Sequence, residues 1–205
     1  VAYRQGRRLN AAISLYCQNL KDTKNLLGPN HPHTLTSRHN LAAAYRDAGR
    51  LEEAITLYEQ NLEDRTRILG PHHPHTLTSR HNLASAYQAA GRLEEAITLY
   101  EQNLEDRTRI LGPNHPDTLA SRNNLAGAYQ DAGRLGEAIT LFEQTLKDFE
   151  NLLGPNHPLT QALRNNLAGT YRAADRFEDA DKLFETSSDS EQDDTEEDLD
   201  QETGD

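Results

Sequence analysis

A segment of 42 residues occurs four times in this chain, and this repetition constrains the fold more than any other feature of the sequence. The copies begin at Leu27, Leu69, Leu111 and Leu153. A fixed period of this length is typical of a stack of similar units, each burying its neighbour, and not of one globular core. The first two copies differ at four positions: Asn30/His72, Ala43/Ser85, Arg46/Gln88 and Asp47/Ala89.

Each copy predicts two amphipathic helices, because its apolar residues recur mostly three or four positions apart. Pro32 suits the first position of a helix, where no backbone N–H is needed, and Gly49 marks the end of that helix. A second helix follows and ends at Gly70. The unit is therefore a helical hairpin, too small to be stable alone. The two apolar stripes comprise Leu35, Leu41, Ala42 and Tyr45, and then Leu51, Ala54, Ile55, Leu57, Tyr58 and Leu62.

The spacing of large, small and aromatic residues in this hairpin resembles the tetratricopeptide repeat. The long second helix, the LGPNHP linkers and the Asn before the Leu-Ala pair resemble the kinesin-light-chain type, which is also found appended to prokaryotic signalling NTPases. The resemblance covers roughly Val1 to Glu185. It implies an all-α fold, a right-handed α-solenoid of stacked antiparallel helical hairpins. The residues that carry it are Leu41, Ala42, Tyr45, Gly49, Ala54, Tyr58 and Leu62.

The two ends of the array differ from its middle. Tyr3 aligns with Tyr45, so residues 1–3 are expected to end one helix, and Arg8 to Leu27 to form a second helix without its partner. Because the chain also has no Met, we interpret it as a fragment of a longer repeat protein. The expected organisation is a truncated repeat at 1–26, full repeats at 27–68, 69–110 and 111–152, a shortened last repeat at 153–185, and an acidic disordered tail at 186–205.

The net charge of −12 is concentrated at the carboxyl end. Residues 185–205 include eleven Asp or Glu and no Lys or Arg, and the remainder of the chain is close to neutral. No apolar run is long enough for a membrane span, so no membrane partner is expected. The single Cys17 excludes an intrachain disulfide framework, favours a cytoplasmic location, and is expected to be a small buried hydrophobe.

The resemblance implies that the first helices line a concave wall, which binds an extended peptide or a partner helix. One column of this wall consists of Asn40, Asn82, Asn124 and Asn166. In the resembling family an Asn at this place bonds the backbone of a bound peptide, and an amide can donate and accept at once. The alternative, that the column satisfies backbone groups between hairpins, stays open. The other columns are His39/His81/Asn123/Asn165, Arg46/Gln88/Gln130/Arg172, Thr36/Thr78/Ala120/Ala162, Ala43/Ser85/Gly127/Gly169 and Asp47/Ala89/Asp131/Ala173.

Three of the four differences between segments 27–68 and 69–110 fall in these columns. Such a distribution suits a binding surface that diversifies, although exposed positions tolerate change anywhere.

A further column, consisting of Arg38, Arg80, Arg122 and Arg164, has two interpretations. The guanidinium groups could clamp an acidic ligand, which would make the chain's own acidic tail a candidate for an intramolecular contact. The favoured alternative is that each Arg pairs with a carboxylate of its own hairpin, such as Asp64 or Glu59, and packs its stem between helices.

Other chemistries have little support in the sequence. No phosphate-binding loop or catalytic motif occurs, so an enzyme is not expected. The body of the chain is not net basic, which argues against a nucleic-acid partner. His33 and His75 are replaced by Asp117 and Leu159, so a repeated metal site is excluded, and neither metal nor cofactor is expected. One His recurs in every linker, which suggests a role in the turn or in starting a helix: His31, His73, His115 and His157.

The main functional hypothesis is a protein–protein interaction module that binds a linear peptide or partner helix in its groove. An alternative is the carboxyl-terminal sensor arm of a signalling NTPase, and a weaker one is a structural spacer. The first two differ in what lies upstream of Val1, whereas the third predicts no partner that depends on the groove.

Overall fold

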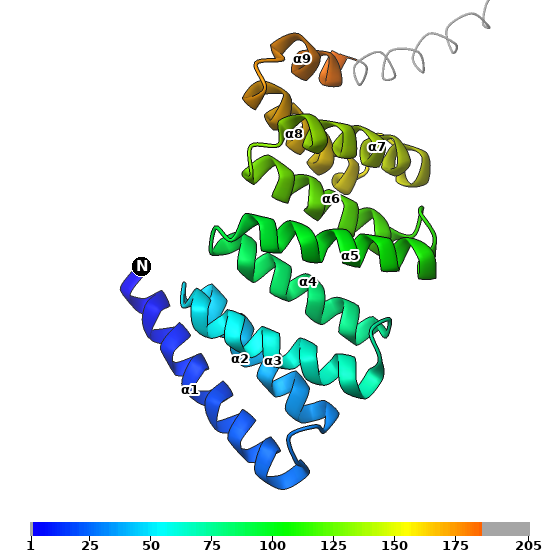
Figure 1. Cartoon of the computed structure of the whole chain (residues 1–205). Coiled ribbons are helices and arrows are strands. Elements are labelled where there is room, and N and C mark those ends of the chain that lie inside the picture. Colours follow the sequence, from blue (N-terminus) through cyan, green and yellow to red (C-terminus); the bar gives the residue numbers. More distant parts are fainter. Residues whose placement is uncertain (1, 186–205) are drawn as a thin grey trace, which may run out of the picture. The chain divides into compact units, whose positions relative to one another are not determined.

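The structure is a computed structural model that describes residues 2–185, and this range is helical throughout apart from short turns (Figure 1). The predicted acidic tail, 186–205, lies outside the described residues. The helices are α1 (Ala2–Leu27), α2 (Pro32–Asp47), α3 (Leu51–Leu69), α4 (Pro74–Ala89), α5 (Leu93–Leu111), α6 (Pro116–Asp131), α7 (Leu135–Leu153), α8 (Pro158–Ala173) and α9 (Phe177–Glu185).

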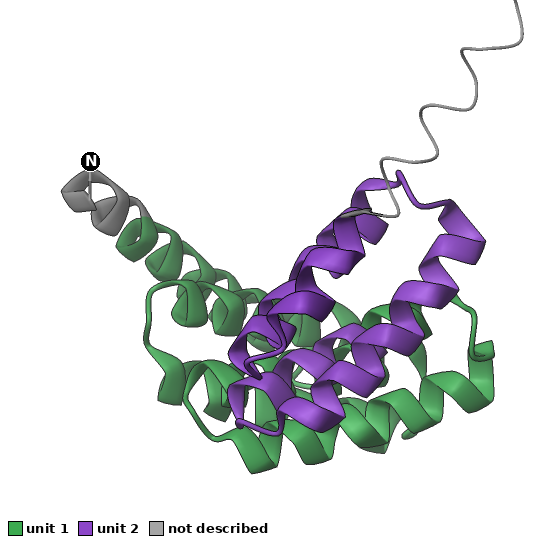
Figure 2. Cartoon of the chain, turned by 90° about the horizontal axis from the view of Figure 1, so that it is seen from above, with its two compact units in different colours: residues 1–121 green, residues 122–205 purple. Residues whose placement is uncertain are grey.

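Consecutive helices pack against one another. The chain divides into two compact units, residues 1–121 and 122–205, and the division falls inside α6 (Figure 2). In unit 1, α1 packs on α2, α2 on α3, α3 on α4, and α4 on α5. In unit 2, α7 packs on α8 and α8 on α9. This is the packing of an α-solenoid built from antiparallel helical hairpins, which confirms the predicted fold class.

A left-handed residue closes each hairpin. The N–H of Arg50 bonds the carbonyl oxygen of Tyr45, and the N–H of Gly49 bonds that of Arg46, both at 2.9 Å. This pair of bonds satisfies carbonyl groups that the end of a helix leaves open. Gly49 has a φ of 73°, a conformation in which a Cβ is unfavourable, so glycine ends the helix as predicted. Asp175, with a φ of 58°, takes this place in the last hairpin, and aspartate tolerates it better than most residues.

A histidine begins the first helix of each hairpin. His31 caps α2, and its Nδ1 accepts a hydrogen bond from the N–H of His33 at 3.2 Å. Pro32 lies in the first turn, where its missing N–H costs nothing. The ring therefore satisfies one of the donors that a helix leaves unbonded at its start. The predicted role in starting a helix is confirmed, because the same bond, at 3.1 to 3.2 Å, is made by His73, His115 and His157.

The core pairs small residues with large ones. Ala42 of α2 and Ala54 of α3 have no exposed surface, so the two helices of a hairpin approach closely. Ile13 of α1 packs with Leu41 and Ala44 of α2, which joins α1 to the next hairpin. Helix α3 packs in two directions, against α2 of its own hairpin and against α4 of the next one.

The start of α1 differs from the sequence prediction. Alignment with the next repeat predicts a break between Tyr3 and Arg8, whereas α1 runs without interruption from Ala2 to Leu27. The position that Gly49 occupies in the following hairpin is Arg7 here. A left-handed conformation is unfavourable for a residue with a Cβ, so the helix continues through this position.

Cys17 also differs from the prediction, because it is exposed and not buried. Its Sγ lies 3.7 Å from the hydroxyl oxygen of Tyr45. The same place in the next repeat belongs to Glu59, which accepts a hydrogen bond of 2.6 Å from the hydroxyl of Tyr87. The apolar spacing around Cys17 therefore gave a wrong prediction of its burial. The alignment of Cys17 with Glu59 of the next repeat predicts its contact with the tyrosine hydroxyl correctly.

Candidate peptide-binding surface

The asparagine column lies on the first helices. In unit 1, Asn40 of α2 is exposed and Asn82 of α4 is half-buried; in unit 2, Asn124 of α6 is half-buried and Asn166 of α8 is exposed. Within the described residues, Asn166 is the one member with a hydrogen bond, which it donates through Nδ2 to Oδ1 of Asn123 at 3.5 Å. No member bonds a backbone group in this range, so the amides are available to a ligand.

The histidine column of unit 1 is uncharged at neutral pH. His39 and His81 are half-buried, and their rings lie 5.7 and 5.6 Å from those of Tyr58 and Tyr100. Burial and the nearby cations of Arg65 and Arg46 hold the pKa of His39 below its ordinary value. Burial, Arg107 and Arg46 act on His81 in the same direction. These imidazoles can offer hydrogen bonds to a ligand, but not a positive charge.

Two of the substitutions between the near-identical repeats act together. Arg46 of α2 donates to the neighbouring Asp47 carboxylate at 3.0 and 3.2 Å. In the next hairpin the same two positions are Gln88 and Ala89, and Gln88 accepts a hydrogen bond of 3.1 Å from the hydroxyl of Tyr100. Arg46 and Asp47 thus neutralise each other, whereas Gln88 is free of charge and holds a buried tyrosine.

The corresponding part of unit 2 is also rich in amides. Asn123 is half-buried and Asn165 exposed, and Gln130 accepts a hydrogen bond of 3.0 Å from the hydroxyl of Thr170. Arg172 is exposed and lies 3.6 Å from the Asp181 carboxylate. Side-chain amides are therefore the most frequent polar groups that the sequence analysis assigned to this surface in unit 2.

Two glycines of this surface have no packing role. Gly127 and Gly169 lie within α6 and α8, and an added Cβ would meet no atom within 4 Å at either position. Glycine inside a helix costs about 1 kcal/mol relative to alanine. The neighbouring structure therefore does not require these glycines.

The arginine column makes ion pairs within the protein. Arg38 bonds Asp64 and Arg80 bonds Asp106, each at 2.6 Å and each between the two helices of one hairpin. All four arginine side chains are largely buried, and Arg122 and Arg164 bond Asp148 and Glu150 at 2.5 and 2.7 Å. The predicted pairing within one hairpin is confirmed for Arg38, Arg80 and Arg122, whereas Arg164 of α8 bonds Glu150 of α7, in the preceding hairpin. Because these guanidinium groups are already engaged, they offer little to an acidic ligand.

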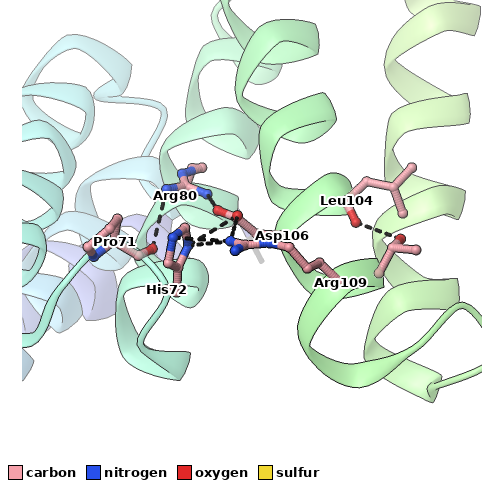
Figure 3. A network of polar contacts seen from close by, with 7 residues as sticks. Pro71, His72, Arg80, Leu104, Asp106 and Arg109 are labelled. Atoms are coloured by element: carbon pink, nitrogen blue, oxygen red, sulfur yellow. Dashed lines mark hydrogen bonds and ion pairs between the residues drawn. The ribbon is translucent and has the colours of Figure 1, made fainter.

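Figure 3 shows the most extended of these networks. The Asp106 carboxylate accepts hydrogen bonds from Arg80 at 2.6 Å and from Arg109 at 2.9 Å, and the His72 ring lies 3.1 Å away. Burial raises the pKa of Asp106, but the bonds from Arg80 and Arg109 outweigh it and leave the pKa below its ordinary value. Since Arg80 also bonds the Pro71 carbonyl oxygen at 3.4 Å, the network fastens the linker to both helices of its hairpin.

Two buried asparagines on the second helices are not among the residues predicted from the sequence. Asn61 of α3 and Asn103 of α5 have no exposed surface, and neither amide has a hydrogen-bond partner among the described residues. The signal was present, because Asn61 follows Tyr58 by three positions and thus falls inside the apolar stripe. Because asparagine is polar, the spacing of apolar residues alone does not identify it.

The described residues contain no group of three or more His, Cys, Asp or Glu that could hold a metal ion. None of the helices in this range combines the length and the apolar character that crossing a membrane requires.

Comparisons with known proteins agree with this architecture. A family model for the tetratricopeptide repeat matches the chain four times, over residues 1–63, 36–105, 78–150 and 122–190. The chain belongs to the tetratricopeptide-repeat family. Members of this family are protein–protein interaction scaffolds, and this chain is one of them. No curated protein matches it.

Solved structures identify the type of tetratricopeptide repeat. Two crystal structures of a kinesin-light-chain-like protein from Podosopora anserina, described as having nearly identical TPR-like repeats, are 34% and 35% identical to this chain. They cover 92% and 93% of this chain and 89% and 90% of their own, with TM-scores of 0.81 and 0.80. BtubC from P. vanneervenii, at 24% identity, covers 91% of this chain and 74% of its own with a TM-score of 0.75, and shows the shared fold alone. The repeats are therefore of the kinesin-light-chain-like type.

Proposed function

We propose that the first helices of this tetratricopeptide-repeat scaffold bind a linear peptide or a partner helix, mainly through uncharged hydrogen bonds. The observation that carries the proposal is the asparagine column. The same amide recurs at the same position of the first helices, and it makes no backbone hydrogen bond in the described chain. An amide donates and accepts at once, so it matches a peptide group without regard to the side chain that the peptide carries.

The charges around the column indicate which ligands it suits. Arg46 is paired with Asp47, and the histidines are uncharged at neutral pH. The arginine column is occupied by carboxylates of the protein. A polar segment with little net charge therefore fits unit 1 better than an acidic one does. The same pairing removes the main reason to regard the acidic tail as a ligand of this surface.

Gly127 and Gly169 give independent support in unit 2. Because no neighbouring atom requires glycine there, each position leaves the helix backbone bare on the predicted ligand side. Bare backbone lets a ligand approach more closely than alanine would allow. The loss of helix stability at two positions is then offset by contact with the ligand.

The two alternatives, a sensor arm of a signalling NTPase and a structural spacer, receive no support from the comparisons described above. A peptide-binding scaffold is the function that the described residues favour.

The test begins by selecting peptides from a random library against the full chain. Selected peptides are then titrated against Asn40→Ala and Asn82→Ala, which both lie in unit 1. We expect roughly tenfold weaker binding for each variant, because one amide removes up to two hydrogen bonds. We also expect the dissociation constant to change little between about 50 mM and about 500 mM salt, since no ion pair is formed.

Gln102→Ala, at an exposed position of the second helix α5, is the matched control and should leave affinity unchanged. For peptides that Asn124→Ala weakens, Gly127→Ala separates binding from folding, because it should raise stability by about 0.5–1 kcal/mol and still weaken binding. Peptides whose binding is insensitive to both asparagines, or that bind only at low salt, would show that the ligand uses another surface.

A further inference from the structure

Helix α1 exposes a stripe of side chains more fully than α3 does at the same positions. Tyr16 is 38% exposed, whereas Tyr58 at the same position of α3 is 1% exposed. Leu15 is 72% exposed. Leu26 is 82% exposed, whereas Ile68 at the same position of α3 is 40% exposed. Positions 12, 15, 16, 19, 22 and 26 are among those more exposed than their counterparts in α3, and they lie on one face of a helix. In Figure 1, α2 lies on one side of α1 within unit 1.

The later hairpins show what covers this face. The His39 ring of α2 lies against Tyr58 of α3 at 5.7 Å, and His81 of α4 lies against Tyr100 of α5 in the same way. In both cases the cover is the first helix of the same hairpin. It also supplies an arginine, since Arg38 bonds Asp64 across that hairpin at 2.6 Å.

Helix α1 keeps the acceptor for such an arginine. Asp22 corresponds to Asp64 of α3 and is exposed. Among the described residues it bonds the Gln18 Nε2 atom, at 2.8 Å on its own helix, and no arginine. The face therefore combines an apolar stripe, an uncovered tyrosine ring and an arginine-binding carboxylate, in the spacing that α3 uses toward α2.

We propose that this face of α1 docks an amphipathic helix with the chemistry of the chain's own first helices. The docked helix carries an Arg and, directly after it, a ring residue that lies against Tyr16. The pair corresponds to Arg38 and His39 of α2, which contact Asp64 and Tyr58 of α3. A Leu-Ala pair follows and packs on the apolar stripe. The arginine bonds Asp22, so the surface distinguishes this helix from an apolar helix without a cation. This site is separate from the proposed peptide-binding surface.

The probe is a labelled peptide with the sequence of residues 74–89, titrated into the full chain and followed by fluorescence anisotropy. We expect saturable binding of one peptide per chain. Leu15→Glu should weaken binding at least about tenfold, because it removes a buried leucine contact. Asp22→Asn should weaken it about threefold or more. This loss should disappear when the peptide lacks its arginine, as expected for two groups that interact directly.

Ser14→Glu and Glu63→Gln, both at exposed positions, are the matched controls and should bind the peptide normally. All four substitutions are on solvent-facing side chains, so circular dichroism should show intact helices. No saturable binding up to about 1 mM peptide would overturn the proposal. Self-association of the chain alone that Leu15→Glu abolishes would also overturn it, since the occupant would then be a second copy.

Discussion

The hairpins α2–α3 and α4–α5 are nearly identical in sequence, yet the hydroxyl groups of their buried tyrosines have different surroundings. In α4–α5, Gln88 accepts the hydroxyl hydrogen bond of Tyr100. In α2–α3, Arg46 turns to Asp47, and the hydroxyl of Tyr58 has no partner among the described residues. Two side-chain changes thus exchange an internal hydrogen bond for a surface ion pair. Near-identity of repeats therefore does not mean identical chemistry on the surface that they present.

The largest effect should come from the ion pairs that both hairpins share. Asp64→Ala and Asp106→Ala each leave an arginine that is almost buried without its carboxylate, and we expect a loss of about 2–4 kcal/mol in the free energy of unfolding. Urea denaturation followed by circular dichroism measures it. Asp106 binds more groups than Asp64, so its replacement should cost at least as much. A loss of unfolding free energy smaller than that of an ordinary surface substitution would show that these ion pairs do not hold the two helices of a hairpin together.

A smaller effect should follow from converting one hairpin into the other. Replacing Arg46 with Gln and Asp47 with Ala gives Tyr58 the acceptor that Tyr100 has, which should raise stability by about 0.5–1 kcal/mol. Gln88→Arg should lower it by a similar amount, because Tyr100 loses its hydrogen bond to Gln88. Equal stabilities of the parent and both variants would mean that the two arrangements are energetically equivalent.

Histidines in both hairpins allow a pH test. Burial lowers the pKa of His39 and His81, so the unfolded chain binds protons at a higher pH than the folded chain does. The free energy of unfolding therefore decreases as the pH falls below about 6.5, the ordinary pKa of His, because protonation of these histidines favours the unfolded chain. Asn occupies this column at Asn123 and Asn165. We expect His39→Asn with His81→Asn to reduce the difference in Tm between pH 7.5 and pH 5.5, and an unchanged difference would contradict this assignment.

Much of the fold follows from local rules that the sequence displays. Gly49 and the histidine-proline linkers fix where the helices end and begin, because few other residues satisfy those backbone positions. The pairing of Arg38 with Asp64 was also predictable, since a long cation beside an apolar stripe needs a carboxylate nearby.

Other features depend on three-dimensional neighbours and could not be predicted from spacing alone. Cys17 lies in an apolar pattern but is exposed, because the contact made by its column is with a tyrosine hydroxyl of the next first helix. Asn61 is polar but buried, on a helix that packs against both α2 and α4. Arg46 bonds Asp47 and not Tyr58, although both partners are within its reach. The sequence alone does not indicate which of the two Arg46 would bind.

The smallest effect should come from the one difference between the hairpins that lies outside the predicted surface. Asn30 accepts a hydrogen bond of 2.8 Å from Arg67, and His72 takes the same place beside Arg109 at 3.0 Å. Both arginines are more than half exposed and keep their bonds to Asp64 and Asp106. Asn30→His and His72→Asn should therefore each change the free energy of unfolding by less than about 0.5 kcal/mol at neutral pH, and leave peptide affinity unaltered. An altered affinity would extend the binding surface to the linkers, and the diversification of this chain would then involve both ends of its first helices.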